Sequence, residues 1–261
     1  LDPFYTLLMA LDLGAPVTAT ALSGKDFPEG LPVETQAQLD DLGQMAAPNL
    51  EAVIAARPDL IVGSAYGLEK LAPGLRQIAP TVLIDTVDWR EYLTVLGKAV
   101  GRSETAAQQL RSFDSKVTKL RGQLPADSSV SFVRIIPGGY QVYVAGPGAY
   151  APVALLTELG LQRPEYETAD DDTVLRRPTL EGLLELQGDT LIYTIGGAHH
   201  DGDAAALEAE TTGTAIWQAL PAVRAGRAFR VAPRHWMGFG GIASAEAILA
   251  DIRQIYGLPE K

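Results

Sequence analysis

The same short pattern occurs twice in this chain, and this internal repeat limits the possible folds more than any other feature. Residues 50–62 read LEAVIAARPDLIV, and residues 180–192 read LEGLLELQGDTLI. In both segments a Leu-Glu pair is followed by an aspartate and then by an apolar run. The matched glutamates are Glu51 and Glu181. A repeat at this distance in a chain of 261 residues favours two similar lobes over one large domain.

Two further elements recur in the same order. LMALDLG at 8–14 resembles ALLTELG at 154–160, and each predicts an amphipathic helix that ends at a glycine. LIDTVDW ends at Trp89 and RVAPRHW ends at Trp236, and each predicts a short strand followed by a polar loop. Three elements in the same order indicate a duplicated α/β lobe.

Within each lobe, predicted helices alternate with short apolar strands. Asn49 can cap a helix that precedes a strand at 59–64, and Thr179 can cap a helix that precedes a strand at 190–197. This alternation predicts parallel sheets with helices on both faces, which is the α/β class.

A long amphipathic helix is predicted between the two lobes. Ser103 can cap it, and an apolar stripe then continues to Gly122 at helical spacing. The stripe consists of Ala106, Leu110, Phe113, Val117 and Leu120. We therefore expect an N-terminal lobe at 1–100, a rigid backbone helix at 101–124, a C-terminal lobe at 125–261, and a ligand cleft between the lobes.

Composition excludes several classes of function. The formal net charge of −11 argues against nucleic-acid binding, which requires a basic surface. The absence of cysteine excludes disulfides and thiolate metal sites. No apolar run is long enough for a transmembrane helix. The chain begins at Leu1 rather than at Met, so we expect any signal peptide and lipid anchor to lie outside this sequence.

Four segments, taken in order, resemble the helical-backbone (class III) substrate-binding proteins of ABC importers, and most closely the iron–siderophore type (FecB- and FhuD-like). They read PNLEAVIAARPDLIVGS, WREYLTVLGKAVGRSETAAQQL, PTLEGLLELQGDTLIY and FGGIASAEAILADI. The resemblance implies an extracytoplasmic protein, either periplasmic or a cell-surface lipoprotein, that binds a ferric siderophore between its lobes. Such a protein delivers its ligand to a membrane permease and catalyses no reaction. We expect it to be a monomer.

The resemblance also gives the repeated Leu-Glu pair a role. In the family, one glutamate on each lobe meets arginines of the permease, and by motif position these are Glu51 and Glu181. The alternative is structural, because a glutamate in the first turn of any helix interacts favourably with the helix dipole.

Ligands of open α/β sheets bind beyond the carboxyl ends of the strands, so polar and aromatic residues that follow predicted strands are candidate contacts. A ferric siderophore already saturates its iron with oxygen donors, so we expect no intrinsic cofactor and no metal ligand from the protein. Aromatic walls and arginine donors suit such a ligand. By resemblance Arg134 is the strongest candidate. The full set is Arg134, Trp236, Trp89, Tyr66, Arg234, Trp217, His199, Tyr150 and Arg90.

Several of these residues have a structural alternative. Tryptophans in α/β lobes are often core residues, and Trp217 lies in a predicted helix beside Ile216 and Leu220. Tyr143 lies within an alternating strand, where a structural role is expected.

Few basic residues are placed to reach the cleft, which favours a hydroxamate over a triply negative catecholate. The candidate bases are Arg90, Arg134 and Arg234, with Arg176 and Arg177 as further possibilities. A haem or corrinoid receptor of the same fold is one alternative, with Tyr66 or His199 as the axial ligand of haem. A two-lobed chelatase-like α/β enzyme is the alternative from another class.

Two other motifs are set aside. GFGGIA at 238–243 matches a dinucleotide-binding pattern, but too little chain follows it to form the required βαβ unit. HHDGD at 199–203 could hold a divalent metal, but the N-terminal lobe has no histidine to complete such a site.

Overall fold

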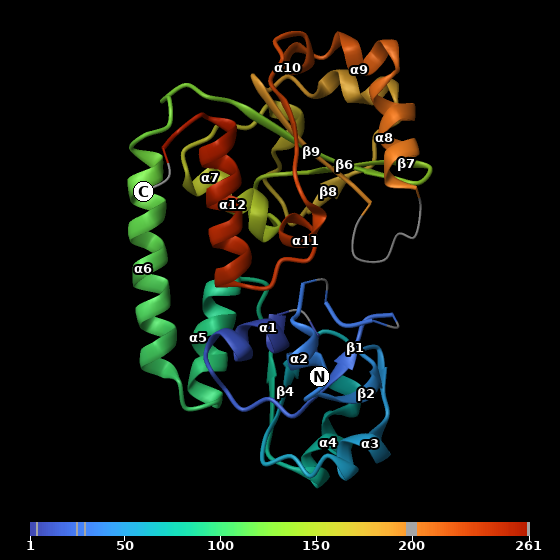
Figure 1. The fold of residues 1–261 in the computed structure, drawn as a ribbon, viewed down its shortest axis with the longest axis vertical. Helices are drawn as coiled ribbons and strands as arrows, with labels where there is room; N and C mark the ends of the chain where they lie inside the picture. The colour runs from blue at the N-terminus through green and yellow to red at the C-terminus, as the bar shows by residue number, and fades with distance from the viewer. Residues whose placement is uncertain (4, 25, 29, 197–202, 260–261) are drawn as a thin grey trace. The chain divides into compact units, whose positions relative to one another are not determined.

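The computed structural model describes residues 1–3, 5–24, 26–28, 30–196 and 203–259. The chain divides into two compact units (Figure 1). The first unit consists of Leu1–Phe113 with Gly238–Ser244, and the second of Asp114–Met237 with Ala245–Lys261. Each unit contains both helices and parallel strands, so the predicted α/β class with two lobes is confirmed.

The first unit contains two small sheets. In one, β1 (Ala19–Leu22) pairs in parallel with β2 (Asp40–Gln44), which pairs in antiparallel with β3 (Ala47–Pro48). In the other, β4 (Ile61–Ser64) pairs in parallel with β5 (Thr81–Ile84). The helices are α1 (Tyr5–Asp12), α2 (Val33–Gln36), α3 (Leu50–Ala55), η1 (Glu69–Leu71), α4 (Ala72–Ile78) and α5 (Trp89–Ala99).

Side-chain caps fix where two helices of this unit begin. Asn49 Oδ1 accepts hydrogen bonds from the backbone N–H groups of Glu51 and Ala52 at the start of α3, as the sequence predicts. Asp88 does the same for α5, through Arg90 and the next residue. Such caps satisfy backbone donors that have no partner within the helix.

The helix α6 (Ser103–Arg121) matches the predicted backbone helix closely. Four members of the predicted stripe are buried, and the fifth, Leu110, is half-buried. The division between the units falls inside this helix, directly after Phe113. The predicted three-segment boundaries at 100 and 124 therefore stay a prediction.

The second unit is built on one five-stranded sheet (Figure 1). Its order is β10 (Ala228–Arg230), β9 (Thr190–Ile195), β6 (Val130–Ile136), β7 (Gly139–Tyr143) and β8 (Leu175–Arg176). The first three strands are mutually parallel, and β7 is antiparallel to both of its neighbours. The helices are α7 (Ala151–Glu158), η2 (Glu165–Glu167), η3 (Glu181–Glu185), α8 (Ala204–Thr212), α9 (Ala215–Ala219), α10 (Pro221–Arg224), α11 (Pro233–Trp236) and, from Ala245 on, α12 (Ile242–Ile255), whose first three residues belong to the first unit.

One buried ion pair supports the central strand of this sheet. Arg163 donates to Glu167, and their side chains are only 2% and 0% exposed. Glu167 also accepts a hydrogen bond from the backbone N–H of Phe132 on β6 at 3.0 Å. A carboxylate in this position satisfies a strand donor while it neutralises a buried cation.

The second copy of the repeated helix is shorter than predicted. The sequence predicts a helix from Thr179 to Gly188, whereas the structure has a 3₁₀ helix, η3, that ends at Glu185. Gly188 lies against the backbone of Ser131, and a side chain at this position would collide with it. This close contact lies three residues after the end of η3.

Within the described residues, no helix combines the length and the apolarity needed to cross a membrane.

Candidate functional site

Two exposed side chains lie at the carboxyl edge of the β4–β5 sheet in the first unit. Ser64 pairs with Ile84 at the ends of these parallel strands, so the residues that follow emerge at the same edge. Tyr66 follows β4 and Val87 follows β5, and each is 89% exposed. The sequence predicts Tyr66 at this edge. Val87 is not among the predicted contacts, because an isolated valine in a loop carries no sequence signal for ligand binding.

Trp89 and Arg90 follow the same edge, but Trp89 points into the core. Its ring is buried against Phe113 and Phe239, with ring centroids 5.4 Å and 5.7 Å away. The Arg90 guanidinium lies over the Trp89 ring at 4.6 Å from its centroid. This corrects the prediction that Trp89 forms a wall of the ligand site: as the first residue of α5, it anchors that helix to the core.

In the second unit, Arg134 reaches the carboxyl end of β9. It lies on β6 opposite Thr194 of β9 and Gln141 of β7. Its Nε donates to the carbonyl oxygen of Gly196, the residue directly after β9. Its Nη1 donates to Gln141 Oε1 at 3.3 Å. Two neighbouring strands thus hold the guanidinium where a parallel sheet offers its ligand-binding edge.

A chain of contacts connects Arg134 with Tyr150. The Tyr143 hydroxyl donates to Gln141 Oε1 at 3.2 Å, and the Tyr143 and Tyr150 rings are 5.4 Å apart between centroids. The Tyr150 hydroxyl in turn donates to the Met237 carbonyl oxygen at 3.2 Å. We call Arg134, Gln141, Tyr143 and Tyr150 the Arg134 group. The structure therefore brings together two of the predicted ligand residues through two residues that were not predicted to bind ligand.

Arg234 lies on α11, three residues before Met237, whose carbonyl oxygen accepts the hydrogen bond from Tyr150. Its side chain is exposed, and its Nε donates to His235 Nε2 at 3.1 Å.

The other two tryptophans are core residues, which corrects their predicted role as ligand contacts. Trp236 is 0% exposed, packs 5.0 Å from the Phe132 ring, and donates from Nε1 to Asp251 at 2.8 Å. Trp217 is buried edge-on against Tyr193 at 5.1 Å. Both rings are packed into the core, where burial of large aromatic rings contributes most to stability. Neither ring therefore has a face left for a ligand.

Three predicted residues remain, namely His199, Glu51 and Glu181. His199 lies outside the described residues. Glu51, in the first turn of α3, and Glu181, the first residue of η3, are both exposed to solvent.

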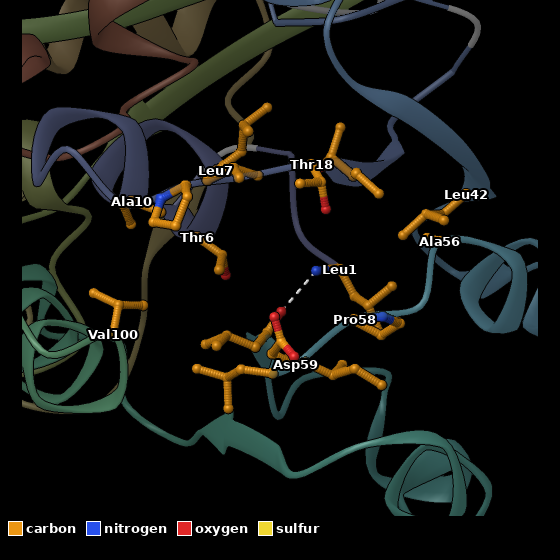
Figure 2. A pocket seen from close by; sticks show the side chains of 18 of the residues that line it. Leu1, Thr6, Leu7, Ala10, Thr18, Leu42, Ala56, Pro58, Asp59 and Val100 are labelled. Carbon is orange, nitrogen blue, oxygen red and sulfur yellow. Dashed lines mark hydrogen bonds between the residues drawn. The ribbon is translucent and has the colours of Figure 1, made fainter.

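A cavity of about 400 Å³ lies within the first unit, apart from these side chains (Figure 2). Its lining is mostly apolar and comes from parts of α1, β1, β2, α3, β4 and α5, together with residues 15–18 and 56–60. Tyr66, Trp89 and Arg90 are not among its lining residues. The Leu1 amino group enters it and donates to the Val62 carbonyl oxygen at 2.7 Å. The cavity therefore does not coincide with the predicted ligand contacts of this unit.

In the described part of the chain, no group of three or more His, Asp or Glu side chains is placed to hold a metal ion.

Comparison with known proteins gives one consistent result. The family described as periplasmic binding protein matches residues 3–234. The "Probable siderophore-binding lipoprotein YfiY" of Bacillus subtilis is 28% identical over 225 residues, which is 83% of this chain and 68% of that protein. The "Achromobactin-binding periplasmic protein" of Dickeya dadantii is 28% identical over 224 residues, covering 83% of this chain and 72% of that protein.

A solved structure agrees over the whole chain. Staphylococcus aureus SirA in complex with staphyloferrin B is 25% identical and superimposes with a TM-score of 0.84, covering 100% of this chain and 93% of SirA.

Proposed function

Since this chain belongs to the periplasmic binding protein family, we propose that it captures a ferric siderophore outside the cytoplasm and delivers it to an ABC importer. The iron arrives inside the chelate, so it is cargo rather than a resident cofactor. The protein acts by binding and release and catalyses no reaction. Relatives named as periplasmic proteins and lipoproteins support the extracytoplasmic location.

The Arg134 group is the observation that carries this proposal. It combines the Arg134 N–H donors at the carboxyl end of parallel strands with the half-buried ring of Tyr150. The oxygens that coordinate iron in a siderophore carry partial negative charge, which arginine N–H donors can meet. The organic shell offers apolar surface, which the Tyr150 ring can cover while its hydroxyl stays hydrogen-bonded. In the first unit, Tyr66 and Val87 are exposed at the edge of the β4–β5 sheet.

We infer the chemical class of the siderophore from the number of basic residues that could bind it. Arg90, Arg134 and Arg234 are few bases for a triply negative chelate, which favours a ferric hydroxamate. Relatives named for ferric citrate, such as the "Fe(3+) dicitrate-binding periplasmic protein FecB" of Escherichia coli (25% identical), make a ferric carboxylate the competing class.

Glu51 and Glu181 serve as the contacts to the permease in this proposal. Both are exposed and occupy equivalent positions of the internal repeat. Exposed carboxylates of this kind steer a partner and fix its orientation more than they add affinity.

A binding panel tests the proposal. The purified protein is titrated by calorimetry with ferric desferrioxamine, ferrichrome, ferric citrate, ferric enterobactin, haemin and cobalamin. We expect saturable binding at or below about 1 μM for one ferric siderophore class, which corresponds to roughly −8 kcal/mol. Binding to haemin or cobalamin alone would assign the protein to that ligand instead. Absence of binding to every compound would refute the siderophore receptor.

A further inference from the structure

The two copies of the internal repeat expose the same pattern of side chains. Along Glu51–Ala55 and along Glu181–Glu185, the glutamate is exposed, the next residue half-buried, the third buried, and the fourth and fifth exposed. The fourth residue is a large aliphatic side chain in both copies. Ile54 is 56% exposed and Leu184 is 42% exposed. A solvent-facing aliphatic side chain therefore recurs, together with an acidic one, at the same positions of both repeat copies.

Local structure places the acidic and aliphatic side chains on one face in each copy. In α3, residues three apart are neighbours on the helix surface, and in the 3₁₀ helix η3 they eclipse each other. A polar side chain accepts backbone hydrogen bonds near the start of each helix, that of the N-cap itself in α3 and that of the residue before the Leu180 N-cap in η3. Asn49 Oδ1 accepts from two backbone N–H groups of α3, and Thr179 Oγ1 accepts from the Gly182 N–H at 3.3 Å. Glu51 with Ile54 and Glu181 with Leu184 thus share one layout, although α3 is an α-helix and η3 is a 3₁₀ helix.

Packing of the core does not account for these aliphatic side chains. Ile54 and Leu184 are exposed, whereas Val53 and Leu183, the residues before them, are buried in the hydrophobic clusters of their units. Single exposed hydrophobic residues are common and need no explanation. An exposed aliphatic residue at the same repeat position in both units, three residues after the same glutamate, indicates a shared use of that face.

We propose that Glu51 with Ile54, and Glu181 with Leu184, are two matching contact points for the ABC permease, each a carboxylate beside an aliphatic side chain. This inference rests on the proposed function, and it adds the chemistry of the partner surface. At each point the permease presents a basic side chain next to an apolar recess.

The two kinds of side chain have different tasks at such a contact. The exposed carboxylates attract the basic groups over a distance and set the orientation, and salt weakens this attraction. The aliphatic side chains lose water only after docking, so they slow dissociation, and salt does not screen that contribution. A purely charged contact would lack this second component.

The test uses an ABC importer of the producing organism, embedded in nanodiscs, whose ATP hydrolysis the parent protein stimulates. The variant Ile54→Ser/Leu184→Ser is compared with the parent protein for binding to the nanodiscs and for stimulation of ATP hydrolysis. Val33→Ser/Val174→Ser is the matched control, because it also removes one exposed aliphatic side chain from each unit. Thermal unfolding checks that each variant is folded.

We expect Ile54→Ser/Leu184→Ser to weaken binding by at least about tenfold, mainly through faster dissociation, as for a central interface contact. The valine control should bind as the parent does. Binding of Ile54→Ser/Leu184→Ser at parent strength would overturn the inference, and so would an equal loss in the valine control.

A second variant separates this inference from the proposed function. Glu51→Ala/Glu181→Ala should weaken binding through slower association and should reduce its dependence on salt. If the glutamate variant binds weakly and the aliphatic variant binds normally, the docking glutamates stand and the aliphatic contacts are refuted. If both variants bind normally, the docking assignment itself fails.

Discussion

Arg134 and Gln141 lie directly opposite each other on β6 and β7, and the Arg134 guanidinium donates to Gln141 Oε1 at 3.3 Å. The same guanidinium donates to the Gly196 carbonyl oxygen. These contacts fix the arginine at the end of the sheet before any ligand arrives. Pre-positioned donors bind more tightly because they lose less side-chain freedom on binding.

We therefore expect Arg134→Ala to weaken siderophore binding by about 10- to 150-fold, the loss of a charge-assisted hydrogen bond of roughly 1.5–3 kcal/mol. Arg134→Lys should recover only part of this loss, because an ammonium lacks the planar fork of donors. Titration calorimetry measures both variants. Parent-like affinity of Arg134→Ala would remove this residue from the site.

Gln141→Leu should weaken binding less than Arg134→Ala does, since it leaves the arginine in place but removes one of its supports. Its effect should disappear in the Arg134→Ala background, because the two residues act through one contact. The double variant is measured in the same titration. Additive losses would show that Gln141 contacts the ligand independently of Arg134.

Tyr66→Ala should lower siderophore affinity by about threefold to tenfold, the range for a lost aromatic contact of roughly 0.5–1.5 kcal/mol. Because the side chain is exposed, its removal should change the free energy of unfolding by less than about 0.5 kcal/mol. Tyr66→Phe should bind nearly as well as the parent. Val33→Ala, an exposed residue on α2, is the control, and an equal loss of affinity there would contradict a specific role for Tyr66.

Glu51→Ala combined with Glu181→Ala should abolish most iron uptake in cells whose only copy of the gene encodes this variant, while the purified protein still binds its siderophore. The matched control is Glu34→Ala/Glu165→Ala, which removes an exposed first-turn glutamate from a short helix of each unit. If the glutamates only favour the helix dipole, both double variants should lose a similar, small amount of stability and none of the uptake.

Arg163→Met should lower the free energy of unfolding by about 3–5 kcal/mol, because it leaves the Glu167 carboxylate buried without its cation. Adding Glu167→Leu should recover part of this loss. The recovery is incomplete because the Phe132 N–H then lacks an acceptor, at a cost of about 1–3 kcal/mol. Urea unfolding followed by circular dichroism gives the double-mutant cycle. Simply additive effects would show that the two side chains do not act as a pair.

Local sequence signals predict the elements of this fold well. Asn49 caps α3 as expected, and the apolar stripe from Ala106 to Leu120 becomes the buried face of α6. Helix caps and periodic apolar residues act within a few residues, so their effect can be read from sequence. The close approach of Gly188 to Ser131, just after the shortened second repeat helix, could not be predicted, because it joins residues far apart in the sequence.

The candidate site is predicted less completely for the same reason. Arg134 and Tyr150 have polar ends that a strand edge can present, and the structure connects them. Trp89 and Trp236 also follow predicted strands, yet both turn into the core because aromatic partners are available there. Sequence position gives the edge of the sheet but not the direction of a side chain.

The burial of every tryptophan gives the chain a built-in optical label for each unit. Trp89 reports on the first unit, and Trp217 and Trp236 report on the second. A chain with Trp217→Phe and Trp236→Phe emits only from the first unit, and a chain with Trp89→Phe only from the second. The red shift of tryptophan emission on unfolding can therefore be followed for each unit separately. Coincident midpoints would mean that the two halves melt as one cooperative block, and separate midpoints that they melt in sequence.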